Sequence, residues 1–210
     1  MHIITDSQNF EARKIALTRN VFNNKKTNIE LYELSSSDRN LLNHIGQNIS
    51  IKEMFPNLKN EKVRSWQDIL DFTVDVAKAS GVKKILALSN NKPCGLATVQ
   101  IEKDSLNLIG IVSIPQDVNK KETFVANTIF CHLFKLANSL KVKNIALEAV
   151  KNSPFNLVKK YSELGFEIDK AGDRYISMVC PRRNILEQFA KLKKLINYQE
   201  IKSHKQITII

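Results

Sequence analysis

The spacing of apolar and polar positions predicts a chain in which helices and strands share one core. Helical spacing runs through residues 6–22, 35–45, 65–81, 125–140, 154–166 and 184–198, and strand-like runs cover residues 28–34, 83–89, 94–103, 106–114, 143–150 and 174–180. Turn-forming residues separate the three middle strands, which predicts an antiparallel meander. The whole order predicts an α/β chain of the α+β kind, with one mixed, mostly antiparallel sheet flanked by helices.

Residue types at the ends of the periodic stretches predict where two of the helices start and stop. Ser65 can cap the helix over residues 65–81, Asp68 completes a capping-box pattern with it, and Gly81 follows the last turn. Pro154 suits the first turn of the helix over residues 154–166, and Gly165 ends that helix.

Composition indicates one domain with a full hydrophobic core. The chain has 210 residues, of which 43% are hydrophobic, and this excludes an intrinsically disordered protein. Its uncharged apolar runs are far shorter than the roughly 20 residues that a membrane-spanning helix needs. Residues 1–10 lack the basic and apolar regions of a secretory signal. We therefore expect a cytoplasmic protein without a membrane-spanning helix.

The cysteines and histidines follow no disulfide or metal-binding pattern. Cys94, Cys131 and Cys180 are odd in number and widely spaced, so we expect three thiols that act as small core side chains. Neighbouring helix positions point about 100° apart, so Cys131 and His132 cannot form a nucleophile–base pair, and we expect His132 on the helix surface. The remaining histidines have no partner at ligand spacing, and no metal site is expected; they are His2, His44 and His204.

The net charge of +11 allows two interpretations. One is a polyanionic partner such as nucleic acid. The other is compositional, because 25 of the 32 basic residues are lysines and most are dispersed along the chain. Nucleic-acid-binding proteins favour arginine and interleave it with aromatic residues. We therefore favour the compositional interpretation.

The last 30 residues concentrate basic side chains around a helical stripe. Residues 181–210 hold seven basic and two acidic residues, and Ile185, Phe189, Leu192 and Ile196 recur at helical spacing. Such a helix either binds an acidic partner or membrane surface, or packs on the domain with its outer face solvated. The ordinary spacing of the stripe favours packing.

The motif KKYSELGF at Lys159–Phe166, following the strand NIALEAV, resembles the GNAT superfamily of acetyl-CoA-dependent N-acyltransferases. The antiparallel meander and the strand–helix–strand–helix order that follows it match the same pattern. The resemblance covers residues 28–180 and implies a GNAT-like acyltransferase domain there. It leaves residues 1–27 as an N-terminal helical extension and residues 181–210 as a basic amphipathic helix and tail. It implies transfer of an acetyl group to an amine on a small molecule or a protein, and a dimer is compatible with it.

The resemblance also implies a loop that binds the pyrophosphate of acetyl-CoA at the start of the helix over residues 125–140. The matching window is Lys121–Ala126, with Phe124 in place of the first glycine of the family pattern. Backbone amides at a helix N-terminus bind anions whatever their side chains, and the lysines add positive charge. The implied cofactor-binding residues of this loop are Lys120, Lys121, Phe124, Val125, Ala126 and Asn127. Alternatively, the segment is a solvated helix start, with the acid Glu122 favourable at the helix N-terminus.

Further contacts to acetyl-CoA follow from the same resemblance. A backbone amide within Val112, Ser113 and Ile114 would polarise the acyl carbonyl, which needs no particular side chain. Asn152, just after the strand over residues 143–150, corresponds to a family asparagine that contacts the cofactor.

Two side chains are implied to handle protons. Tyr161 occupies the motif position whose tyrosine protonates the departing thiolate, and its alternative is a packed ring with a satisfied hydroxyl. The strand over residues 106–114 has no acid or histidine, so Glu148 on the next strand is the substitute base. Its strand looks buried, which would raise the pKa of the carboxyl. Its alternative is a strand-end acid that reaches solvent or a lysine.

Trp66 and Phe72 lie on the helix that borders the acceptor groove in GNAT proteins. They either line a substrate site or pack in the core, and core packing is the interpretation that we favour. The function that the sequence predicts is acetyl transfer by direct attack of the amine. The alternative is a GNAT-fold protein without turnover that acts as an interaction module.

Overall fold

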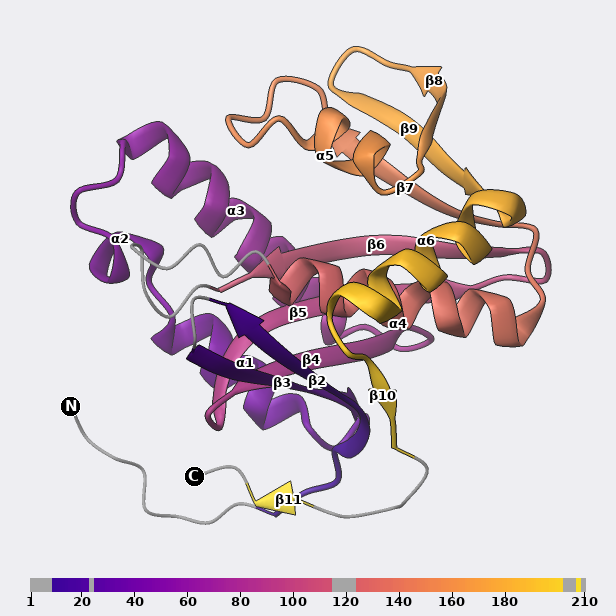
Figure 1. Cartoon of the computed structure of the whole chain (residues 1–210). Coiled ribbons are helices and arrows are strands. Elements are labelled where there is room, and N and C mark those ends of the chain that lie inside the picture. The colour runs from indigo at the N-terminus through magenta and orange to yellow at the C-terminus, as the bar shows by residue number, and fades with distance from the viewer. Residues whose placement is uncertain (1–8, 23–24, 115–123, 202–206, 209–210) are drawn as a thin grey trace.

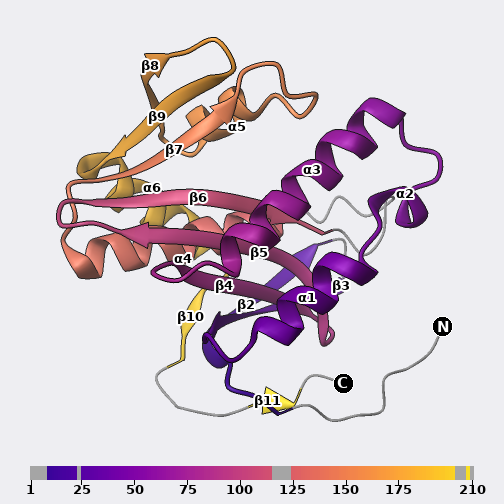
Figure 2. The ribbon, with the colours of Figure 1, turned by 180° about the vertical axis from the view of Figure 1, so that it is seen from behind.

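A nine-stranded sheet with helices on both faces dominates the computed structural model (Figures 1 and 2), which describes residues 9–22, 25–114, 124–201 and 207–208. The strand order is β10-β2-β3-β4-β5-β6-β7-β9-β8, and only the β6–β7 pair is parallel. The sheet is made of β2 (Arg13–Phe22), β3 (Lys25–Leu34), β4 (Lys83–Ser89), β5 (Lys92–Ile101), β6 (Ser105–Ser113), β7 (Asn144–Val150), β8 (Glu167–Ala171), β9 (Tyr175–Pro181) and β10 (Gln199–Glu200). Short strands β1 (Asn9–Phe10) and β11 (Ile207–Thr208) pair separately. The expected mixed, mostly antiparallel sheet is confirmed.

The helices divide between the two faces of the sheet. Helices α1, α2 and α3 lie on one face and α4 and α6 on the other, as the two opposite views show (Figures 1 and 2). Their bounds are α1 (Arg39–Asn48), α2 (Ile51–Met54), α3 (Asn60–Ala77), α4 (Phe124–Leu140), α5 (Leu157–Glu163) and α6 (Arg182–Leu195). Each face buries its own apolar cluster, one under α1 to α3 and the other under α4 and α6. The sheet therefore separates two cores. A ligand that contacted both faces of the sheet would have to pass between two strands.

The helix predicted over residues 6–22 is wrong, because Arg13–Phe22 is a strand of the main sheet. A β-bulge between Lys14 and Ala16 leaves Ile15 unpaired, so Ile15 and its neighbour Ala16 are both buried. Together with buried Ala12 they give an i, i+3, i+4 apolar pattern that imitates a helix.

Two predicted helix starts are also wrong. Helix α3 begins at Asn60, so Ser65 lies inside the helix and caps nothing. Helix α5 begins at Leu157, after Asn156 in the left-handed conformation, and Pro154 lies in the preceding segment. Gly165, with a φ of +85°, follows the C-cap Leu164 as the motif predicts.

Helix α6 packs on the sheet through the stripe that the sequence predicts. Ile185, Leu192 and Ile196 are buried in the α4-side core, and Phe189 packs against it. Packing is therefore the role of this face of the helix. Cys94, Cys131 and Cys180 are buried thiols in the core, as predicted. Burial raises the pKa of Cys131 and of Cys180 to about 12, so both stay protonated.

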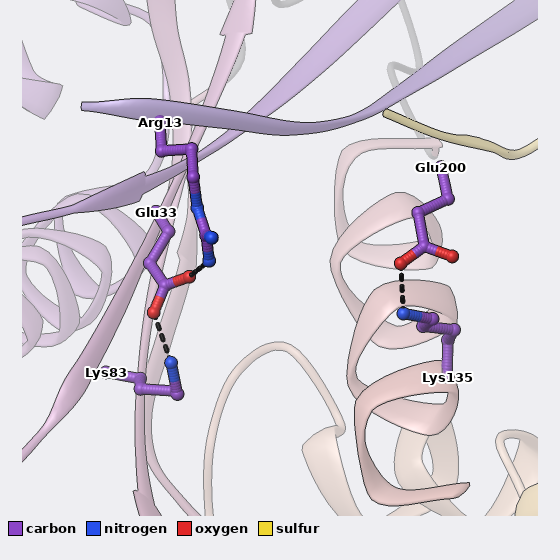
Figure 3. A network of polar contacts seen from close by, with 5 residues as sticks. All are labelled: Arg13, Glu33, Lys83, Lys135 and Glu200. Atoms are coloured by element: carbon purple, nitrogen blue, oxygen red, sulfur yellow. Dashed lines mark hydrogen bonds and ion pairs between the residues drawn. The ribbon is translucent and has the colours of Figure 1, made fainter. Parts of the chain in front are cut away.

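Ion pairs join the outer strands on the α4 side (Figure 3). Glu33 on β3 lies between Arg13 on β2 and Lys83 on β4, and Lys135 on α4 pairs with Glu200 on β10. Burial alone would raise the pKa of Glu33, but its hydrogen bonds to Lys83 and Arg13 hold that pKa below the ordinary value. Within the described ranges, no helix is long and apolar enough to span a membrane.

Candidate active site

Strands β6 and β7 pair over half their length and then separate. Their parallel register joins Ser105–Leu108 to Asn144–Leu147 and stops there, although β6 continues to Ser113 and β7 to Val150. The shift in the β5–β6 register falls at Ile109, where a bulge bends β6. Figure 1 shows β7 diverging from β6 beyond this point. The segments of the two strands that do not pair with each other are Ile109–Ser113, the β6 arm, and Glu148–Val150, the β7 arm, and we call them together the β6–β7 fork.

The β6 arm of the fork carries backbone groups that have no strand partner. Ile114 donates its N–H to the carbonyl of Cys94 on β5 at 2.7 Å. Because bonding directions alternate along a strand, Val112 also bonds toward β5, whereas Ile111 and Ser113 point toward the fork. Of the three residues predicted to offer an amide, Ser113 is therefore the one whose N–H faces the fork.

The N-terminal turn of α4 lies against β5 beside this arm. A Cβ on Gly95 would come within 2.6 Å of Val125 Cγ1 and 3.2 Å of Ile129 Cδ1, so the close approach of α4 depends on glycine. Gly95 pairs directly with Ser113. The first amides of α4, from Phe124 onward, therefore begin next to the fork, and the first turn of α4 has no acidic residue.

The predicted pyrophosphate loop is described only in part. Lys120 and Lys121 lie outside the described residues. In the described part, Val125 is buried, and Phe124, Ala126 and Asn127 are partly buried at the start of α4.

Tyr161 on α5 is buried on the α4 side of the sheet. It is 9% exposed and packs its ring against Phe130 and Phe166, with centroids 5.9 and 6.0 Å away. Burial raises the pKa of Tyr161 to about 12, so its hydroxyl is protonated and can donate. In the part of the chain that the structure describes, no group hydrogen-bonds this hydroxyl.

Glu148 lies in the fork on the opposite face and is exposed. Its neighbours Leu147 and Ala149 are buried in the α4-side core, so Glu148 points to the α3 side. The expectation that Glu148 is a buried, desolvated carboxylate is wrong, since the strand is buried on one face only. Asn152 follows β7 by two residues and is exposed. Tyr161 on α5 is thus buried on the α4 side of the sheet, whereas Glu148 in the fork is solvated on the α3 side.

An aromatic cluster borders the fork on the α3 side. Trp66 stacks on Phe55 at 5.4 Å between ring centroids, meets Phe155 edge-on at 5.7 Å, and donates its Nε1–H to Ser113 O at 2.8 Å. Trp66 is only partly buried. Phe72 is 53% exposed, so the expectation that it packs in the core is wrong.

His132 was expected on the helix surface and is instead buried on α4, with 8% of its surface exposed. Its Nδ1 lies 2.8 Å from the hydroxyl of Tyr198, which helix α6 brings over α4. Burial lowers the pKa of His132 to about 4, and the positive charge of Lys135 contributes a smaller part of this shift. The histidine is therefore a neutral core residue.

Sequence reasoning missed Phe155, the Trp66–Ser113 hydrogen bond and the role of Gly95. A glycine inside an apolar strand does signal close backbone approach, so Gly95 could have been found. Phe155 lies in an irregular segment far from Trp66 in sequence, and only the tertiary structure brings the two rings together.

No protein-family sequence model matches the chain, and the search of curated protein sequences gave no match. Solved structures do match. FdhC, described as a nucleotide-linked sugar GNAT, has a TM-score of 0.54 at 9% identity, covering 90% of this chain and 99% of its own. Aminoglycoside 6'-acetyltransferase type Ii has a TM-score of 0.53 at 13% identity, covering 72% and 96%.

A third match is a chimera of the spermidine N-acetyltransferase SpeG from Vibrio cholerae and hSSAT. It has a TM-score of 0.50 at 15% identity and covers 75% of this chain and 98% of its own. At such identities the similarity is one of fold.

Proposed function

We propose, from the premise that this chain has the fold of the GNAT N-acetyltransferases, that it transfers an acetyl group from acetyl-CoA to a primary amine. The observation that carries the proposal is the β6–β7 fork, where the Ser113 amide is free of strand pairing and the N-terminus of α4 begins beside it. Those two features are what an acyl donor with an anionic pyrophosphate needs. They are independent of the side chains that the resemblance rests on.

The α4 end of the fork would hold the pyrophosphate of acetyl-CoA. The amides of Phe124, Val125, Ala126 and Asn127 belong to the first turn of α4, which has no acid, and helix N-termini favour anions. Lys120 and Lys121 would add charge from the preceding loop, and Asn152 would contact the cofactor from beyond β7. Acetyl-CoA supplies an activated thioester, whose carbonyl oxygen the Ser113 amide would polarise.

The face of the fork that α3 borders would receive the acceptor amine. The pyrophosphate end belongs to the α4 face, so the thioester would meet the amine on the opposite face. Glu148 points there and is solvated, so it would accept the amine proton directly or through water.

Tyr161 would stabilise the leaving sulfur. The amine nitrogen bonds to the carbonyl carbon, the C–S bond breaks, and the sulfur leaves as a thiolate. A phenol with a pKa of about 12 stays protonated beside a thiol of ordinary pKa, roughly 8.5. Tyr161 would therefore donate a hydrogen bond to the thiolate, and the proton that leaves the amine would neutralise the sulfur in the end.

A specific observation favours a second candidate, a GNAT-fold interaction module without turnover. Phe124 stands where the family pattern has its first glycine, and β6 has no acid or histidine among its residues. A thiol-release assay with acetyl-CoA and a panel of amines separates the two. Release that depends on the amine supports the enzyme, whereas acetyl-CoA binding with no release for any amine supports the module.

A further inference from the structure

Trp66, the single tryptophan of the chain, contacts the β6 arm of the fork and the segment that follows β7. Its Nε1–H donates to the carbonyl of Ser113, at the end of the β6 arm, at 2.8 Å. Its ring meets Phe155 edge-on, with centroids 5.7 Å apart and planes at 70°. Phe155 belongs to the segment that follows β7. One side chain from α3 therefore links two segments whose strands are no longer paired.

The hydrogen bond holds a peptide unit that the sheet secures on one side only. The peptide between Ser113 and Ile114 donates its N–H to Cys94 O on β5 at 2.7 Å. Its carbonyl faces the fork, where a neighbouring strand would normally supply a donor. Trp66 takes the place of that donor. With both ends of this peptide bonded, rotation about the Ser113 Cα–C bond is restricted, and Ser113 is held from its C-terminal side. Its own N–H belongs to the preceding peptide, which therefore has less freedom to turn.

The donor is itself held rigidly. The indole stacks on Phe55 with an interplanar angle of 14°, and Phe55 is 2% exposed at the C-terminal end of α2. The indole thus contacts two aromatic rings, the buried ring of Phe55 and the ring of Phe155.

We propose that Trp66 is a positioning residue that aligns the Ser113 amide and sets the spacing between the β6 arm and the segment after β7. Its effect on the structure is a property of the free protein. Its effect on catalysis rests on the proposed function, because the aligned amide is the one that would polarise the acyl carbonyl. A preformed donor is worth more than one that must be reoriented during the reaction.

A simpler role for Trp66 is packing, and the two roles predict different behaviour for Trp66→Phe. This variant keeps an aromatic ring against Phe55 and Phe155 but removes the N–H. Phe55→Leu is the matched control, since it removes the stacking ring and leaves the N–H donor in place. If Trp66 acts through packing alone, Phe55→Leu should disturb the fork at least as strongly as Trp66→Phe does.

Amide hydrogen exchange in the ligand-free protein tests the structural part. Trp66→Phe should raise exchange roughly fivefold within residues 109–114, the effect of one ordinary hydrogen bond, and leave β4 unchanged. Phe55→Leu should raise exchange in these residues by less than twofold. Unchanged exchange at residues 109–114 in Trp66→Phe, or an equal rise in both variants, would overturn the proposal.

Kinetics and fluorescence test the catalytic part. Trp66→Phe should lower kcat about fivefold and keep the KM for acetyl-CoA within twofold, because the contacts at α4 are untouched. In the wild type, the emission of Trp66 should shift as acetyl-CoA binds. The catalytic role is refuted if acetyl-CoA binds to the wild type without shifting the emission of Trp66 and Trp66→Phe keeps the wild-type kcat. Absence of acetyl-CoA binding to the wild type refutes the proposed function instead, and hydrogen exchange still decides the structural role.

Discussion

The two side chains expected to handle protons in the fork have opposite surroundings. Tyr161 is enclosed by Phe130 and Phe166, whereas Glu148 is solvated on the other face of β7. A buried neutral phenol suits hydrogen-bond donation to a thiolate, and an exposed carboxylate suits proton removal from an amine that arrives from water. Under the proposed function, the acyl donor would use one face of the fork and the acceptor the other.

Tyr161→Phe should lower kcat by roughly 10- to 100-fold, since it removes one donor to the developing thiolate. Affinity for acetyl-CoA should stay within twofold and Tm nearly constant, because the ring contacts with Phe130 and Phe166 remain. Steady-state kinetics, calorimetry and thermal melts measure these quantities. A parallel loss of stability and activity would make Tyr161 a packing residue.

His132 should make the stability of the fold depend on pH. Burial lowers its pKa to about 4 from 6.5, so the unfolded chain binds a proton that the folded chain refuses. The stability contribution is complete above pH 6.5 and is lost as the pH falls from 6.5 toward 4. Between pH 7 and pH 5 the free energy of unfolding should fall by about 2 kcal/mol, measured by urea denaturation.

The control is His132→Gln, which keeps a polar partner for the Tyr198 hydroxyl and does not titrate. Its free energy of unfolding should vary much less over the same interval. An unchanged slope would assign the pH dependence to other groups.

At the scale of elements, the sequence predicts segments that have a continuous apolar run or a regular apolar spacing, and it misses segments that have neither. The meander β4 to β6, helix α4 and strand β7 were predicted from such patterns and are confirmed. Strand β8 was missed because all five of its residues are exposed. Strand β2 was misread because its bulge breaks the alternation.

The sequence likewise predicts some parts of the candidate site and misses others. The motif with Tyr161 is visible in the sequence, and so is the start of α4. The solvated position of Glu148 depends on which face of β7 the other elements cover, and the Trp66–Ser113 contact joins residues 47 positions apart. Patterns of local spacing do not contain that information.

The contact between α4 and β5 should be the most sensitive packing point at the fork. Gly95→Ala should destabilise the protein by about 1–3 kcal/mol, because its Cβ would overlap Val125. It should also weaken acetyl-CoA binding, since the first turn of α4 would move. Val125→Ala in the same chain should recover part of both losses, and a double-mutant cycle measures the coupling. Additive effects would contradict the proposed contact.

For the molecule as a whole, the fork is a place inside the described sheet where two neighbouring strands, β6 and β7, stop pairing. It lies between two cores that belong to opposite faces. The matched structures share this fold at low identity, so the proposed function rests on the residues of this chain's own fork. The net charge of +11 leaves nucleic-acid binding as an alternative interpretation, which salt-dependent binding to generic DNA or RNA would test.

Calorimetric titration of the wild-type chain with acetyl-CoA tests the central claim most directly. A fork with a free Ser113 amide and an α4 N-terminus should bind one acetyl-CoA per chain, with micromolar to submillimolar affinity that weakens in Gly95→Ala. A chain that gives no heat at millimolar acetyl-CoA, and no increase in Tm in its presence, would contradict the claim that this fork is an acyl-CoA site.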